Sequence, residues 1–196
     1  MRKIALILLA LISTAVVNAQ DITQTPEWTQ LLNALQNENW QQANDLSNQC
    51  LKKAMINEPE NNMPAVLRYM VILSESGLMN DGKISQEKAL SDVKGFEGKP
   101  IVLPGHPITA KLAFNSVNMV NGKTDSLYVL AGNKSRTEIF AFEYIALSEK
   151  WPVDDFKASV GKVCRLSGTL SSITVEGHLL PRFRIIINDA QYDISN

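Results

Sequence analysis

The segment GFEGKPIVLPGHP, residues 95–107, marks the point where the chain changes its pattern. Glycine and proline recur through it, and both residues interrupt regular helices and strands. Before this segment, apolar residues repeat with the spacing of a helix. After it, β-branched and aromatic residues form short alternating runs. The chain is therefore predicted to be an α+β protein, with a helical region at residues 20–96 and an antiparallel β domain at residues 97–196.

Four helices are predicted before the change. Thr25 is suited to cap the first helix, with Pro26 at its first position. Pro64 opens the third helix, which we expect to end at Gly77, and Ser85 is placed to cap a short fourth. Apolar residues on many sides of the third helix indicate that its neighbours cover it. The inner stripes of the first two helices are Trp28, Leu31, Leu32 and Leu35, and then Trp40, Ala43, Leu46, Cys50 and Ala54.

Five strands are predicted after the change. Turn signals at Asn121-Gly122, Gly132-Asn133 and Glu176-Gly177 separate several of them. Because no long helix intervenes, the pattern favours an antiparallel sheet, a sandwich or a small barrel. The predicted strands are residues 109–115, 126–131, 137–147, 162–172 and 182–188.

Part of the helical region resembles a known repeat. NWQQA at residues 39–43, followed by Cys50-Leu51 and Pro59, resembles the second half of a tetratricopeptide repeat, and residues 28–35 resemble its first helix. The consensus glycine position holds Leu32, the spacing between the helices is one residue short, and the proline comes late. The resemblance implies a concave surface for peptides or partner proteins. A generic helical hairpin is the alternative.

A second resemblance lies in the β region. GKVCRLSGTL, residues 161–170, is similar to the first strand of the oligonucleotide/oligosaccharide-binding fold, with Gly168 at the bend. This resemblance implies a small barrel that binds a glycan or a nucleic-acid strand. Lys162, Arg182 and Arg184 would then contribute to the binding surface.

The first 19 residues have the layout of a secretory signal peptide. Positive residues at Arg2 and Lys3 precede an apolar run of about fourteen residues, which is shorter than the roughly 20 residues of a membrane span. Small residues then lead to Ala19. We expect cleavage after Ala19, a mature chain in the periplasm or outside the cell, and no membrane span after cleavage.

The composition and the absence of known motifs argue against several classes of function. The chain has 196 residues, of which 45% are hydrophobic, and a formal net charge of −1. These values fit a globular protein, and the lack of a basic excess argues against a nucleic-acid partner. No phosphate loop, dinucleotide fingerprint or paired metal-ligand motif occurs, so we predict neither a cofactor nor a metal site.

Four side chains are candidate ligand-binding residues. Glu143 shares a strand face with apolar residues, so it needs either a partner or a place at a sheet edge. Arg136, Arg165, Arg182 or Arg184 could pair with Glu143, and Arg182 and Arg184 lie on one face of their strand. His106 is held between two prolines. Structural ion pairs and ordinary solvated loops are the alternatives to a binding role.

The two cysteines have two interpretations. Export would allow a disulfide between Cys50 and Cys164 that joins the two regions. Both residues also fit independent core positions, because one falls on the inner stripe of a helix and the other in a strand.

The leading functional prediction is an exported, non-enzymatic protein-interaction or assembly module of the bacterial envelope, with a protein or peptide partner. A ligand-binding β module is the second hypothesis, and a hydrolase that uses Glu143 or His106 is the last. The oligomeric state is not predicted. Polar helix faces could bond a peptide backbone or could be solvated surface. Their residues include Gln36, Gln41, Gln42, Asn44 and Asn48.

Overall fold

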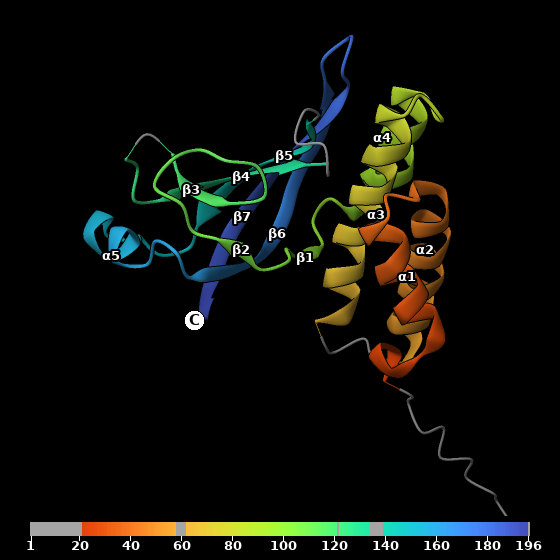
Figure 1. The fold of residues 1–196 in the computed structure, drawn as a ribbon, viewed down its shortest axis with the longest axis horizontal. Coiled ribbons are helices and arrows are strands. Elements are labelled where there is room, and N and C mark those ends of the chain that lie inside the picture. The colour runs from red at the N-terminus through yellow and green to blue at the C-terminus, as the bar shows by residue number, and fades with distance from the viewer. Residues whose placement is uncertain (1–20, 58–61, 121, 134–138, 196) are drawn as a thin grey trace, which may run out of the picture.

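The computed structural model describes residues 21–57, 62–120, 122–133 and 139–195. The predicted signal peptide lies outside the described residues, as does Pro59 of the repeat-like segment. Figure 1 shows a layer of helices beside a twisted sheet. The α+β prediction is thus confirmed, and the described helices of the first region precede the strands along the chain.

The helical layer begins where the capping signals predicted. The Thr25 side chain accepts a hydrogen bond from the backbone N–H of Trp28 at 3.3 Å, and Ser85 accepts one from Lys88 at 3.2 Å. Both oxygens satisfy an N–H group that the first turn of a helix leaves free. The helices are α1 (Pro26–Gln36), α2 (Trp40–Asn57), α3 (Met63–Asn80) and α4 (Gln86–Val93), preceded by the 3-10 turn η1 (Ile22–Gln24) and followed by η2 (Lys94–Phe96).

The end predicted for the third helix is wrong, because α3 continues through Gly77 to Asn80. Gly77 is buried against the indole ring of Trp40, and a Cβ atom at this position would overlap that ring. The glycine is therefore a packing residue that lets α2 and α3 approach closely. It does not act as a helix end.

The sheet has the strand order β1-β6-β7-β5-β4-β3, and β2 also pairs with β6. All strand pairs are antiparallel except β5 with β7, which are parallel. The strands are β1 (Pro100–Val102), β2 (His106–Pro107), β3 (Val117–Met119), β4 (Ser126–Gly132), β5 (Ile139–Leu147), β6 (Val163–Glu176) and β7 (Arg182–Ser195).

Three predictions for the β region need correction. The sheet is mixed because the chain passes through α5 (Val153–Ala158) and β6 after β5, and the second strand of the β6–β7 hairpin then lies beside β5. The sheet is also not closed, so the small barrel predicted from residues 161–170 is wrong. Residues 109–115 form no strand and contribute one isolated bridge, between Phe114 and Leu130.

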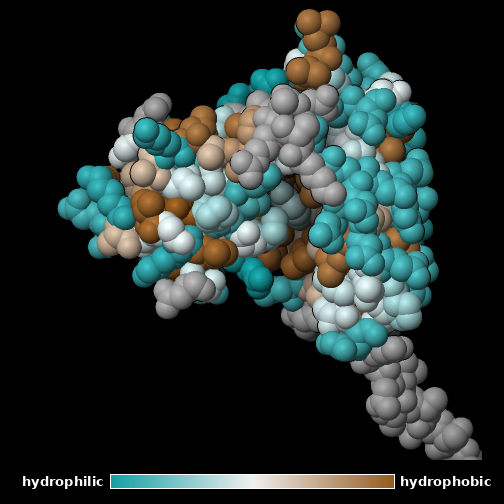
Figure 2. All heavy atoms as spheres, viewed as in Figure 1, coloured by the Kyte–Doolittle hydropathy of each residue, from teal (hydrophilic) through white to brown (hydrophobic). Residues whose placement is uncertain are grey.

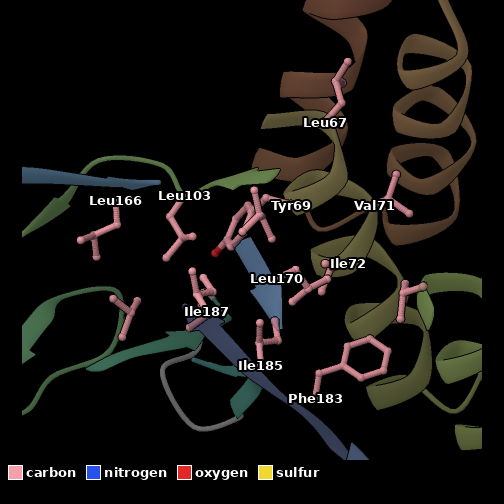
Figure 3. Packing of buried hydrophobic residues seen from close by; sticks show 14 of the residues in the cluster. Leu67, Tyr69, Val71, Ile72, Leu103, Leu166, Leu170, Phe183, Ile185 and Ile187 are labelled. Carbon is pink, nitrogen blue, oxygen red and sulfur yellow. The ribbon is translucent and has the colours of Figure 1, made fainter. Parts of the chain in front are cut away.

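One hydrophobic core joins the helices to the sheet. Helix α3 packs against α2 on one side and against β1, β5 and β7 on the other. The covered position predicted for this helix is therefore confirmed, and both regions contribute to the same buried cluster. Figure 3 shows Tyr69 and Ile72 of α3 on the side of the sheet, whereas Leu67 and Val71 of α3 lie farther from it. The labelled residues on the sheet side are Leu103, Leu166, Leu170, Phe183, Ile185 and Ile187. Within the described residues, no helix combines the length and apolarity that a membrane span requires.

Candidate binding groove

Two adjoining hollows lie where the helical layer meets the sheet, and we call them together the junction groove. The first has a volume of about 430 Å³ and is almost wholly apolar. Figure 2 shows apolar side chains gathered in the recess between the two layers. The described lining of this hollow is Trp28, Leu32, Leu35, Met63, Val66, Tyr69, Met70, Leu73, Val102, Leu103, Pro104 and Arg165.

The apolar hollow exists because α1 and α3 each carry more apolar residues than the core uses. On α1, Leu31 is fully buried while Leu32 beside it is 42% exposed. On α3, Leu67 and Val71 enter the core, whereas a second stripe at positions 63, 66, 70 and 73 faces the groove half-buried. At 1.5 Å per residue this stripe is about 15 Å long. The extended segment after β1 forms the opposite wall.

The second hollow continues from the first and is more polar. It has a volume of about 480 Å³ and shares Leu35, Tyr69, Leu73 and Pro104 with the apolar hollow. The junction groove therefore changes from apolar to polar along its length. The other residues that line the second hollow are Gln36, Glu38, Trp40, His106, Asn115, Ala131, Gly132 and Asn133.

His106 is the buried polar side chain of the second hollow. It lies opposite Cys164 in the β2–β6 pair and is only 7% exposed. Its Nε2 atom has no hydrogen-bond partner among the described residues. Burial lowers the pKa of His106 to about 4, and the backbone of Asn115 offsets only part of this effect. The imidazole is therefore neutral at pH 7.

Glu143 lies beneath the groove and not in its lining. It is fully buried in the middle of β5, on the sheet face that α3 covers, between Val129 of β4 and Ile185 of β7. Neither carboxyl oxygen has a hydrogen-bond partner in the described chain. Burial raises the pKa of Glu143 to about 8, and the phenol of Tyr69, which faces it without reaching hydrogen-bond geometry, offsets part of the rise. This carboxyl group is therefore largely neutral at pH 7.

The predicted cluster of Glu143 with Arg182 and Arg184 does not form. Side chains alternate across a strand, and Glu143 is in register with Ile185, so the two arginines lie on the opposite face of the sheet. Both arginines pair with Glu176 instead, at 3.9 Å for Arg182 Nη2–Oε2 and 3.2 Å for Arg184 Nη1–Oε1. Of the four candidate residues, only His106 lines the junction groove.

The predicted disulfide does not form either. Cys50 and Cys164 are both free thiols and both buried. Cys50 belongs to α2 and Cys164 to β6, and α3 lies between α2 and the sheet. Burial raises the pKa of the Cys164 thiol to about 12. The cysteines thus occupy separate core positions, which was the alternative interpretation.

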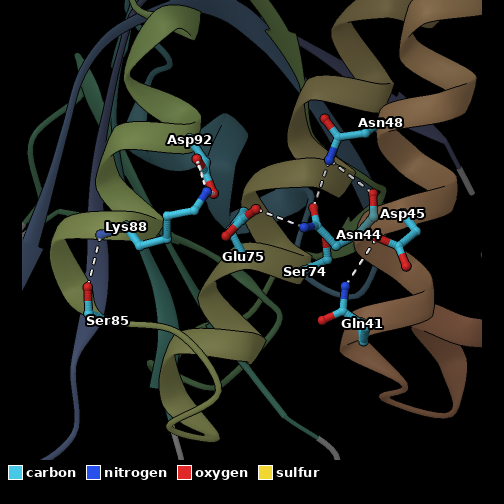
Figure 4. A network of polar contacts seen from close by, with 9 residues as sticks. All are labelled: Gln41, Asn44, Asp45, Asn48, Ser74, Glu75, Ser85, Lys88 and Asp92. Carbon is cyan, nitrogen blue, oxygen red and sulfur yellow. Dashed lines mark hydrogen bonds and ion pairs between the residues drawn. The ribbon is translucent and has the colours of Figure 1, made fainter.

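The asparagine-rich face of α2 bonds within the protein. Asn44 donates from Nδ2 to Glu75 Oε1 at 2.8 Å, and Asn48 donates from Nδ2 to Asn44 Oδ1 at 2.9 Å (Figure 4). Burial raises the pKa of Glu75 to about 7, and its bond to Asn44 opposes that rise. Asn44 and Asn48 are therefore structural, whereas Gln36 lines the groove.

The sequence did not predict most of the junction groove: Trp28 was expected in the core and Arg165 as a possible partner of Glu143, whereas both line the apolar hollow together with Tyr69. A signal was present in the third helix, where apolar residues on several sides serve both the core and the groove. Which face would be left open depends on the neighbouring layer, and periodicity alone does not show this.

The chemical character of the groove follows from the side chains that line it. Its described lining contains no serine, cysteine or lysine. Among the described residues, no group of three histidine, cysteine or acidic side chains is placed to hold a metal ion. Comparison with family models, curated proteins and solved structures finds no match to this chain.

Proposed function

We propose that this protein is an exported, non-enzymatic interaction module of the bacterial envelope that holds an apolar segment of a partner protein in the junction groove. The observation that carries the proposal is the apolar hollow between α1, α3 and residues 102–104. Leu32 of this hollow is 42% exposed, and Met70 is half-buried at the edge of the core. Contact with a partner would remove this apolar surface from water.

The open shape of the groove favours a protein segment over a small molecule. Small-molecule sites commonly enclose 70–90% of the ligand surface. Here Leu32 is 42% exposed and Pro104 is exposed as well, so the walls do not close over an occupant. A peptide can bury its apolar side chains in such a groove while its backbone stays in water. Amphipathic segments commonly dock in apolar grooves in this way.

The expectation of a glycan or nucleic-acid ligand has less support. It depended on a closed barrel and on free arginines, whereas the sheet is open and Arg182 and Arg184 are engaged by Glu176. The hydrolase hypothesis also has less support, because Glu143 is completely buried and His106 is almost completely so.

Selection of peptides on the full chain tests this proposal. A random peptide library displayed on phage would be panned against the protein and against Leu32→Asp, which places a charge in the groove. The matched control is Leu179→Asp, because Leu179 is 95% exposed at the tip of the β6–β7 hairpin, away from the groove lining.

The expected result is enrichment of apolar peptides that bind the parent and Leu179→Asp but lose binding to Leu32→Asp. A buried charge without a partner opposes apolar contact, so the loss should be at least about tenfold. Circular dichroism would confirm that each variant folds. Peptides that bind Leu32→Asp as tightly as the parent would contradict the proposal.

A further inference from the structure

Arg165 is the one charged residue among the described residues that line the apolar hollow. It lies on β6, it is exposed, and it makes no hydrogen bond or ion pair through its side chain in the described part of the chain. The guanidinium group is therefore available at the groove.

The orientation of Arg165 is notable because a carboxylate lies beside it on the sheet. Asp193 of β7 is directly opposite Arg165 in the β6–β7 register. Such neighbours share a face, and opposite charges in this position commonly pair. Among the described ion pairs none joins these two residues, and Arg165 contributes to the groove lining instead. The cation thus faces the surface that an occupant would cover.

The chemistry of the hollow then specifies its occupant. An apolar surface selects apolar side chains, and one unpaired guanidinium at its edge selects a carboxylate beside them. We propose that the partner segment held in the junction groove is an acidic-apolar peptide, whose aspartate or glutamate pairs with Arg165 while neighbouring apolar side chains contact α1 and α3. This inference rests on the proposed function and adds the charge of the partner.

The geometry of arginine makes this recognition selective. The planar guanidinium can donate two parallel hydrogen bonds to one carboxylate, whereas a glutamine side chain accepts through a single oxygen. Lysine or arginine in the peptide would be repelled. The rest of the described apolar lining carries no charge, so Arg165 is the residue of this lining that can select the charge of an occupant.

A charge reversal at Arg165 tests the inference. The same phage-displayed peptide library would be panned in parallel on the full-length parent, on Arg165→Glu and on Arg184→Glu. Arg184 is the matched control because it is an exposed arginine on the opposite face of the sheet. One selected peptide would then be synthesised with glutamate and with glutamine at its acidic position. Its affinity would be measured by the change in tryptophan fluorescence, since Trp28 lines the hollow.

The inference predicts enrichment of apolar peptides with an acidic residue by the parent and by Arg184→Glu, and of peptides with a basic residue by Arg165→Glu. The parent should bind the glutamate peptide about fivefold more tightly than the glutamine peptide, and Arg165→Glu should lose that preference. Added salt should reduce the preference.

Other outcomes separate this inference from the proposed function. One such outcome is that the parent enriches apolar peptides with no excess of acidic residues, and that these peptides fail to bind Leu32→Asp. This result would overturn the role of Arg165 and leave the groove as the docking site. An acidic preference that persists in Arg165→Glu would overturn it too. Peptides insensitive to both Leu32→Asp and Arg165→Glu would overturn the groove proposal and the inference together.

Discussion

Replacing Glu143 with glutamine should remove a large part of the pH dependence of folding. The pKa of Glu143 is about 8 in the folded protein, compared with an ordinary value of 4.5. The unfolded chain therefore loses this proton at a lower pH than the folded protein does. The contribution of Glu143 to the free energy of unfolding is therefore greatest below about pH 4.5. It falls as the pH rises toward 8 and no longer changes above that pH.

The size of the effect follows from the same two pKa values. One pKa unit corresponds to about 1.4 kcal/mol, so burial of Glu143 costs about 3 to 5 kcal/mol of unfolding free energy between pH 5 and pH 9. Glutamine has nearly the same shape and no proton to lose. Glu143→Gln should therefore gain stability relative to the parent by about this amount as pH rises.

Urea unfolding, followed by circular dichroism at several pH values, measures the difference between the two proteins. Comparison of the pair cancels contributions from Glu75 and His106, which also titrate in this range. Glu149→Gln is the control, because Glu149 is exposed after β5, and its difference from the parent should stay within about 0.5 kcal/mol. Parallel stability curves for the parent and Glu143→Gln would refute the reasoning and would mean that Glu143 has a partner.

Three further predictions test other parts of the structure. Gly77→Ala should destabilise the fold by about 2 kcal/mol or more in chemical unfolding, because its methyl group would overlap Trp40; an unchanged midpoint would contradict the packing. Ser85→Ala should cost about 1 kcal/mol through loss of the cap on α4, and a neutral result would show that the cap is dispensable. Cys50 and Cys164 should both resist a thiol reagent in the native protein and both react after denaturation without reductant; no reaction in the denatured protein would reveal a disulfide.

The order of elements was predictable because local signals decide it. Caps at Thr25 and Ser85 began helices where expected, since an oxygen that meets a free N–H acts within one turn. The change of pattern at residues 95–107 also marked the boundary between helices and strands, because glycine and proline interrupt regular structure locally. Gly77 was misjudged because its role comes from Trp40, which lies far away in the sequence.

The site was less predictable because it is formed by contacts between layers. Alternation placed Glu143 on an apolar face, and the structure confirms that face. The strand sequence alone does not show that Glu143 lies beneath Tyr69 of α3. The groove position of Arg165 depends in the same way on how β6 sits relative to α3. Periodicity in the sequence identifies the apolar face of each helix or strand, whereas the groove depends on how the helices pack against the sheet.

Hydrogen exchange of the full chain with and without a selected peptide tests the central claim most directly. When the peptide binds, we expect slower exchange in α1, in residues 63–73 of α3 and at residues 102–106, and no such protection in Leu32→Asp. Protection confined to the β6–β7 hairpin or to the sheet face that carries Arg184 would contradict it.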